Sequence, residues 1–534
     1  MEMFHETSMF PCLLLTVSLT AAQTSAPGSG QPVPLEAPAP AVKLSVEDTR
    51  AEGAAVDPHT EQPTETPGDL PATSSEASRI LPTSLFDLPE IAPSAGGSTL
   101  AVGGTAVAAP SAGTSVGPKR RALPSPFLSP PFPGSDYQGS PPLIGISVGS
   151  PSYPLMQALQ GTWHGDFLNS NRINVYGWFD VGGNISSSKL SNVPLSYNIV
   201  PNSVQLDQAI LRFERVPDSV QTDHMDWGFR FTNLYGIDYR YTTAKGYFSD
   251  QLLQHNNLYG YDPLEIYGLL YIPWIAQGLI LKIGRYISPP DIEAQLAPDN
   301  YLYSHSIMYT YDPYTFTGIQ AQVKLNDQWT IFLGVHAGND MAPWSNSAQP
   351  NGEVLLRWVS KDNNDSVYFG LDSIGDGRFK NEHDDLQVAV ATWGHRFSDR
   401  IHTMTEGYYI WQRDALLGGT VVNGPPHTFF EATGPGPLIP GISPDVGGVN
   451  YTNFMLTPRD YVTVRNDFLN DIKGQRTGFI NLYTEHTIGW AHYFSQNIMV
   501  RPEARYERSY NTPAYDNGTR KNQFTVAADM IFRF

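Results

Sequence analysis

The sequence predicts an all-β protein whose main domain is a transmembrane, up-and-down antiparallel β-barrel of about 16 strands, with a disordered N-terminal extension. Three observations support this prediction. Apolar and polar residues alternate along the C-terminal part. Short and long connections between these segments also alternate, and the chain ends in an amphipathic segment whose last residue is Phe534. The composition agrees, since only 16% of the 534 residues are charged and 12% are aromatic.

Residues 1–22 have the features of a signal peptide. Residues 9–19 are apolar but too few to span a bilayer as a helix, and Thr20-Ala21-Ala22 follows as a small-residue cleavage pattern, although no Lys or Arg precedes Lys43. Export to the cell envelope is therefore expected. Because Cys12 is the single cysteine and lies in this leader, the mature chain is expected to form neither a disulfide nor a thiolate site.

Residues 23–139 are predicted to be a disordered periplasmic linker. About half of the 44 prolines lie in or just after it, and its Pro, Ala, Ser and Thr residues show no apolar period that could build a core. Residues 140–170 are predicted to lead into a barrel of residues 171–534. A G-x-S-x-G match at residues 145–149 lies among prolines rather than between a strand and a helix, so it does not indicate a nucleophile elbow.

Strands are predicted where residues of one kind recur at every second position. In residues 172–183, Phe179 and Val181 lie on one face, and Trp178 and Asp180 on the other. The same alternation is present in residues 226–232, 317–325 and 497–509. In a membrane barrel the apolar face contacts lipid and the polar face lines the lumen.

The connections between the predicted strands alternate in length. Tight turns are expected at residues 326–328, 398–400 and 495–497, and a long Gly/Pro/Asn-rich loop at residues 415–459. The apolar segment 267–284 is predicted as two strands joined near residues 273–278 rather than as a membrane helix, because Pro273 interrupts it. At roughly 10 residues per strand, an even number between about 14 and 18 is expected, and such a barrel leaves an aqueous lumen.

The last strand is predicted to carry a signal for barrel assembly. Counting back from Phe534 by twos gives only apolar residues. A terminal aromatic residue on such a face resembles the signal that bacterial outer-membrane barrels present to their assembly machinery. The residues assigned to this signal are Phe524, Val526, Met530, Phe532 and Phe534. Outer-membrane lipid and the assembly machinery are therefore expected partners.

Residues 129–534 resemble the OmpL-like family of β-barrel porins from the outer membranes of Gram-negative bacteria. The resemblance is carried by INVYGWFDVGGN (173–184), DWGFRFTNLYGIDYRYT (226–242), IGRYISPPDIEAQLAPDNYLYSHS (283–306), VRNDFLNDIKGQRTG (464–478), RPEARY (501–506) and DNGTRKNQFTVAADMIFRF (516–534). It implies an outer-membrane channel for passive diffusion of small hydrophilic solutes, with neither catalytic residues nor a cofactor. A homo-oligomer is expected only by analogy with general porins.

Charged residues on the predicted inner face are the candidate pore lining. They are Arg501, Glu503, Arg505, Glu507, Arg230, Asp226, Lys282, Asp180, Arg465 and Asp529. Such residues can select solutes by charge, but charges that neutralise one another across neighbouring strands and fix the register produce the same pattern. The net charge of −19 argues against nucleic-acid binding, and the net charge of −11 from Pro151 onward mildly favours cations.

No metal site is predicted. Asp291, Glu293, Asp299 and Asn300 offer oxygen ligands for a divalent cation, but such loop residues at irregular spacing are more often turn and cap residues. The histidines include no H-E-x-x-H pair, and His395 and His402 are expected to face each other across a hairpin.

Two other functions fit the same sequence. In the first, the barrel is an anchor and residues 23–139 reach through the periplasm for adhesion or envelope tethering. In the second, an outer-membrane hydrolase carries Ser and His at the barrel rim, although no motif indicates one. Deleting residues 23–139 distinguishes the tether from the channel, because only the channel would keep its function.

Overall fold

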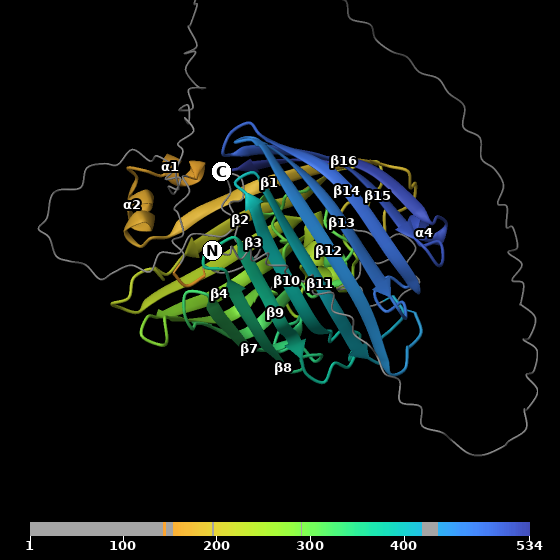
Figure 1. Cartoon of the computed structure of the whole chain (residues 1–534), viewed down its shortest axis with the longest axis horizontal. Helices are drawn as coiled ribbons and strands as arrows, with labels where there is room; N and C mark the ends of the chain where they lie inside the picture. The colour runs from red at the N-terminus through yellow and green to blue at the C-terminus, as the bar shows by residue number, and fades with distance from the viewer. Residues whose placement is uncertain (1–142, 146–152, 195–196, 290, 419–435) are drawn as a thin grey trace, which may run out of the picture. The chain divides into compact units, whose positions relative to one another are not determined.

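The computed structural model describes residues 143–145, 153–194, 197–289, 291–418 and 436–534. In this part of the chain, sixteen strands form one closed antiparallel barrel in which strands adjacent in sequence pair and β1 closes against β16 (Figure 1). The predicted fold class and strand number are confirmed. The predicted signal peptide, the linker and residues 146–149 of the G-x-S-x-G match lie outside the described residues.

The strands have between 9 and 16 residues, enough to cross a bilayer when tilted. They are β1 (Asn174–Ser186), β2 (Val204–Arg215), β3 (Asp226–Gly236), β4 (Gly260–Ile272), β5 (Leu279–Ile287), β6 (Thr315–Lys324), β7 (Trp329–Asn339), β8 (Asn351–Val359), β9 (Asp365–Ile374), β10 (Gln387–Ser398), β11 (Ile401–Arg413), β12 (Ile442–Thr457), β13 (Asp460–Asp471), β14 (Asn481–Tyr493), β15 (Ile498–Ser509) and β16 (Asn522–Arg533).

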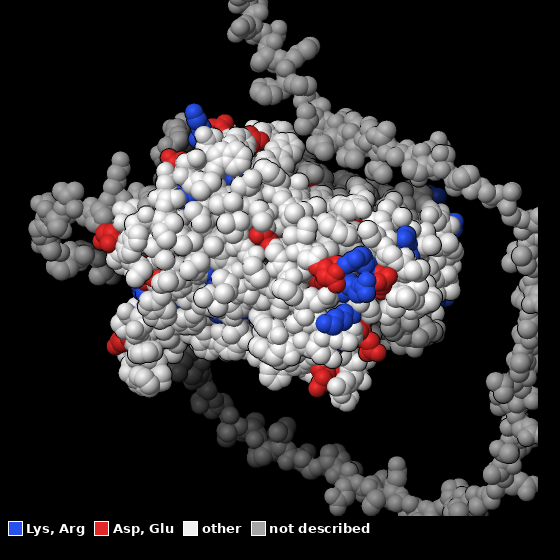
Figure 2. All heavy atoms as spheres, turned by 90° about the horizontal axis from the view of Figure 1, so that it is seen from below, with Lys and Arg blue, Asp and Glu red and all other residues white. Residues whose placement is uncertain are grey.

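The period-two pattern decides which side chains face outward. In β16, buried and exposed residues alternate along the whole strand. Phe524, Met530 and Phe532 keep 45–50% of their surface exposed, whereas Asp529 and Ile531 between them are buried. A continuous apolar outer face is stable only in an apolar medium, so this face contacts the hydrocarbon of the membrane. In Figure 2, charged residues are sparse over most of the surface and gather mainly in one patch.

Most connections at one end of the barrel are short turns, and most of those at the other end are longer loops. β10 and β11 are joined by residues 399–400, and β14 and β15 by residues 494–497. The segment 267–284 forms β4 and β5, as predicted. The prediction of one loop over residues 415–459 is wrong, because β12 occupies its second half. The glycine-rich sequence of β12 has low strand propensity, but pairing with β11 on one side and β13 on the other satisfies its backbone.

Two matching aromatic clusters mark the turn end of the outer surface. Asp365 Oδ1 lies 3.1 Å from Trp393 Nε1 and 2.6 Å from His395 Nδ1. The same arrangement recurs on β13 and β14 with Asp460, Trp490 and His492. Amphipathic aromatic side chains of this kind form the girdle of outer-membrane barrels at the membrane–water interface.

Short helices occupy the lead-in segment and the loops. They are α1 (Pro154–Ala158), α2 (Trp163–Ser170), α3 (Asp250–Leu253), α4 (Tyr515–Gly518) and the 3₁₀ helices η1 (Ile237–Tyr241), η2 (Ala297–Asp299) and η3 (Tyr309–Tyr311). Figure 1 shows α1 and α2 at the same end of the barrel as the C-terminus. Among the described residues, no helix has the length and apolar character needed to cross a membrane.

Candidate functional site

The loop between β5 and β6, residues 288–314, folds into the lumen. Its ends meet at a neck, where Ser288 N donates to Tyr314 O at 3.1 Å and Ser288 Oγ donates to Pro313 O at 2.5 Å. All of its described residues are buried except Asp299 and Asn300, which are partly exposed. We call this segment the constriction loop.

The constriction loop crosses the lumen and binds the inner wall. Gln208 on β2 donates to Gln295 O at 2.6 Å and accepts from Ala297 N at 3.1 Å. On β13, across the barrel from β5 and β6, Arg465 donates to Ser304 Oγ at 2.9 Å. The open aqueous lumen expected from the strand number is therefore partly filled. A strand count fixes the width of a barrel but cannot show which loops enter it.

Three inward-facing glycines leave room for the constriction loop. A Cβ atom on Gly182 would lie 2.0 Å from the hydroxyl of Tyr303, one on Gly489 would lie 2.3 Å from a methyl of Leu302, and one on Gly447 would lie 2.6 Å from Met308 Cγ. These distances are shorter than any van der Waals contact. A glycine in a strand often marks such a close approach, and this is a signal in the sequence that the strand analysis missed.

Two arginines of the predicted pore lining hold the constriction loop. Arg501 on β15 donates to Ala297 O at 2.8 Å and Asn300 O at 2.7 Å, and pairs with Asp529 on β16. Arg465 on β13 pairs with Glu485 and lies 3.7 Å from Glu293 of the loop. Each guanidinium thus joins the wall to the loop while an acid neutralises its charge, which a buried arginine requires.

A second charged network lies on β2, β3 and β4. Arg230, a predicted lining residue, lies 2.9 Å from Glu214 and 3.2 Å from Glu265, and Arg212 lies 2.8 Å from Glu265. Arg212, Glu214 and Glu265 were not predicted. The spacing Arg212-x-Glu214 on one strand face repeats that of Arg505-x-Glu507 and could have revealed them, whereas the pairing with β4 could not be read from the sequence.

The other predicted lining residues also lie on the inner wall. Arg505 lies between Glu503 and Glu507, with Nε 3.2 Å from Glu507, and its two terminal nitrogens have no hydrogen-bond partner among the described residues. The Lys282 ammonium lies 4.3 Å from the ring centre of Tyr286. Asp180 is buried at the middle of β1, and Asp226 lies apart at the mouth, where it pairs with Arg172 and Arg215. The structure thus places nine of the ten on the inner wall and Asp226 at the mouth, and their role in selectivity stays a prediction.

The assembly-signal residues lie on the outer face of β16, where Phe524, Val526, Met530 and Phe532 are exposed. The ring of Phe534 lies 5.3 Å from that of Phe179 on β1, so the last residue packs at the seam where the barrel closes.

The expectation that His395 and His402 face each other is wrong. His402 pairs in register with Arg396 rather than His395, so it faces inward and lies 2.9 Å from the Tyr301 hydroxyl.

Part of the lead-in segment fills the mouth at the turn end. Ile144 packs among the inward-facing Tyr267 and Tyr271, and Ser219 Oγ donates to Leu143 O at 3.4 Å. Tyr153, just before α1, stacks on Tyr176 of β1 with ring centres 3.8 Å apart. Residues ahead of the first strand therefore narrow the lumen from this end, and the constriction loop narrows it further inside.

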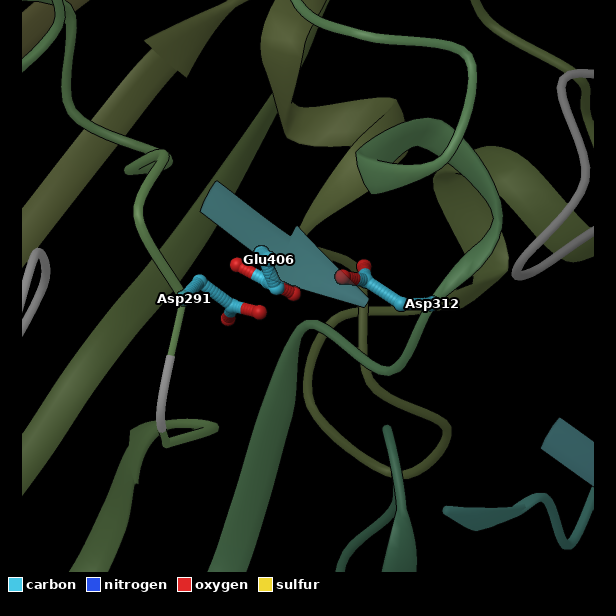
Figure 3. Close-up of side chains that lie close together, drawn as sticks. All are labelled: Asp291, Asp312 and Glu406. Atoms are coloured by element: carbon cyan, nitrogen blue, oxygen red, sulfur yellow. The ribbon is translucent and has the colours of Figure 1, made fainter. Parts of the chain in front are cut away.

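Three acids of the described residues lie close enough to hold one metal ion. Asp291 and Asp312 come from the two ends of the constriction loop and Glu406 from β11, and one oxygen of each lies within 4.8 Å of the others (Figure 3). Burial and the neighbouring Glu293 raise the pKa of Asp291 to about 8. Burial and the Asp291 carboxylate raise the pKa of Asp312 well above its ordinary value. Of the acids considered in the sequence, only Asp291 belongs to this cluster.

Glu293 and Asn300 have structural contacts instead. Glu293 accepts from the Tyr451 hydroxyl at 2.6 Å and from Ser306 N at 2.9 Å. The Asn300 side chain donates to Ala294 O at 2.6 Å and accepts from Ala294 N at 2.8 Å, so it closes a turn inside the constriction loop. Acids far apart in the sequence, on a loop and a distant strand, form the cluster, and no local spacing could have revealed it.

Residues 172–534 match the family model described as "Putative beta-barrel porin-2, OmpL-like". No curated protein matches the chain at a significant level. Similar solved structures include an anion-selective porin from Comamonas acidovorans (8% identity, TM-score 0.45, covering 68% of this chain and 99% of that chain), OmpF of Salmonella typhi (11%, 0.44, 68% and 97%) and the outer-membrane channel DcaP of Acinetobacter baumannii (10%, 0.39, 68% and 97%).

Proposed function

Since the chain belongs to the OmpL-like family of β-barrel porins and is thus a channel of the bacterial outer membrane, we propose that the constriction loop and the charged inner wall together form its selectivity filter. Small hydrophilic solutes diffuse passively through the space between the constriction loop and the inner wall. The observation that carries this proposal is the attachment of the loop to β2, β13 and β15 across the lumen. Solutes that enter the barrel must pass this cross-section.

The charges of the filter suit small solutes of either sign. Arg501 and Arg465 are each paired with an acid, so the field along the loop alternates in sign instead of favouring one kind of ion. Arg505 also lies beside two acids, Glu503 and Glu507, but its terminal nitrogens donate no hydrogen bond to the described residues. We expect Arg505 to contribute most to selection by charge.

The proposed partners are outer-membrane lipid along the apolar outer face, the assembly machinery through the Phe534 end of β16, and further copies of the chain. The family has no catalytic residues, which favours a channel over an enzyme.

The tethering alternative rests on the length and proline content of residues 23–139. If that segment is a tether, its deletion abolishes the envelope function and leaves the permeability of the barrel unchanged.

Swelling of liposomes that contain the purified protein tests the channel. Sugars of increasing mass are added outside, and we expect rapid swelling with a monosaccharide and much slower swelling with a trisaccharide, because the constriction loop leaves a narrow path. Liposomes without protein and liposomes with heat-unfolded protein are the controls. No swelling with the monosaccharide would contradict a channel, and equal rates for all sugars would contradict the constriction.

A further inference from the structure

The cluster of Asp291, Asp312 and Glu406 lies where the constriction loop meets the wall. Asp291 and Asp312 flank the neck closed by Ser288 and Tyr314, so the neck brings the two carboxylates together. Glu406 approaches from β11, and its second role is to accept from Ile292 N at 2.8 Å. Figure 3 shows the three side chains directed toward one another from the loop and the strand.

The space between these carboxylates has the size of a single ion. It is bounded by the neck residues, by Asp372 on β9 and by Val388 and Tyr408, and it holds about one water-sized sphere. Calcium binds oxygen ligands at roughly 2.3–2.6 Å, so oxygens on one calcium ion lie up to about 5 Å apart. The three oxygens lie within 4.8 Å of one another, close enough to share one such ion.

Asp372 is a further indication of a ligand. It is 4% exposed, it lines the same space, and its Oδ1 has no hydrogen-bond partner among the described residues. Asp312 Oδ1 and Glu406 Oε1 are also buried without a partner. Buried acceptor atoms are nearly always satisfied in native proteins by a donor, a water or an ion.

The charge of the cluster points to a cation. Several buried acids elsewhere in the lumen pair with an arginine: Glu265 with Arg212, Asp384 with Arg476 and Asp529 with Arg501. Within the described ranges, no Lys, Arg or His forms an ion pair with the four acids of the cluster. Because the ligands are all carboxylates, without His or Cys, a hard divalent cation suits them better than zinc or copper.

We propose that Asp291, Asp312 and Glu406 bind one Ca²⁺ ion, with Asp372 as a fourth ligand, and that this ion fastens the neck of the constriction loop to β9 and β11. The site joins segments that are otherwise separate in the sequence. Its existence does not depend on the solute that the channel passes, because calcium binding is measured on the folded protein itself.

Calorimetric titration of the purified full chain in detergent, after removal of metal by a chelator, tests the site. We expect one calcium ion per chain, and affinities at least about tenfold weaker for Asp312→Asn and for Glu406→Gln, since each removes one charged ligand. Glu353→Gln is the matched control, because Glu353 is equally buried on the inner wall but hydrogen-bonds to Gln320 and does not line the space. Heat-modifiable migration in gels shows that each variant has folded.

The outcomes are distinct. Weaker binding in both cluster variants with unchanged binding in Glu353→Gln supports the site. Equal calcium binding in all four proteins, or no binding by the folded wild type, overturns it, and the latter result means that shared protons neutralise the carboxylates. Magnesium binding as tight as calcium binding overturns the assignment to Ca²⁺. If neither variant folds, the wild type is digested with a protease in the presence and absence of calcium. We then expect calcium to protect the neck from cleavage, and no protection contradicts the proposal.

Discussion

Replacing Arg501 by glutamine is expected to release the constriction loop, whereas the same change at Arg505 is expected to leave the loop in place. Both arginines lie on β15, face inward and are about 1% exposed. Only Arg501 donates to the loop, through the carbonyls of Ala297 and Asn300 at 2.8 and 2.7 Å. The two substitutions remove the same charge, so a difference between them reports the attachment of the loop.

The size of the effect follows from these two hydrogen bonds. A hydrogen bond with a charged partner contributes about 1.5–3 kcal/mol, so the two together hold the loop by roughly 3–6 kcal/mol. Since about 1.4 kcal/mol corresponds to a factor of ten, the ratio of released to attached loop should rise by roughly 10²- to 10⁴-fold. Glutamine can keep one weaker hydrogen bond, so we expect a rise in this ratio toward the lower end of that range. Arg501→Gln also leaves Asp529 without its partner, so Arg501→Gln/Asp529→Asn is the variant that isolates the loop effect.

Single-channel recording in planar bilayers measures this release. We expect Arg501→Gln, alone and with Asp529→Asn, to show larger and more variable conductance steps than the wild type. Arg505→Gln should keep the wild-type step size and raise the cation-to-anion permeability ratio. Identical conductance traces for Arg501→Gln and Arg505→Gln would refute the attachment, and an unchanged permeability ratio in Arg505→Gln would return that residue to a structural role.

Three further predictions concern the surfaces of the barrel. Arginine in place of Ile283, which is 56% exposed at the middle of β5, should destabilise the barrel in lipid by about 2–4 kcal/mol in urea unfolding, and Ile283→Leu should not. Phe532→Asp should lower the yield of heat-modifiable protein in the outer membrane, whereas Arg533→Gln on the inner face should lower it less. Equal losses would contradict an outer-face signal. Tyr153→Ala removes the ring stacked on Tyr176 and should raise conductance by opening the mouth; an unchanged conductance would show that the lead-in segment does not limit flux.

The barrel could be predicted from the sequence because its determinants are local. Alternation along each strand reports the two environments of the sheet, as in β16, where Phe532 faces out and Asp529 faces in. The turns are equally local, because two to four polar residues between alternating segments leave no room for another element. β12 was not predicted as a strand, because its glycines and Pro444 are typical of a loop. Its strand conformation comes from pairing with its two neighbours.

The site was harder to predict because it depends on contacts between distant residues. The ten lining residues could be assigned to the inner face from periodicity, but their partners could not: Arg501 contacts Ala297 about two hundred positions away, and Asp291 meets Glu406. The route of the constriction loop depends on the depth of the lumen and on gaps left by residues such as Gly182 and Gly489. The positions of these glycines do not show which loop side chains fill the gaps until the structure places those side chains opposite them.

The central claim, that the constriction loop limits passage through the barrel, is tested most directly by the conductance of a variant without it. Because Ser288 N and Tyr314 O lie 3.1 Å apart, a short Gly-Ser linker in place of residues 290–312 can close the neck without straining β5 or β6. The loop-deleted barrel should conduct several times more than the wild type in planar bilayers and admit the trisaccharide that the wild type retards. A conductance equal to that of the wild type would contradict the claim.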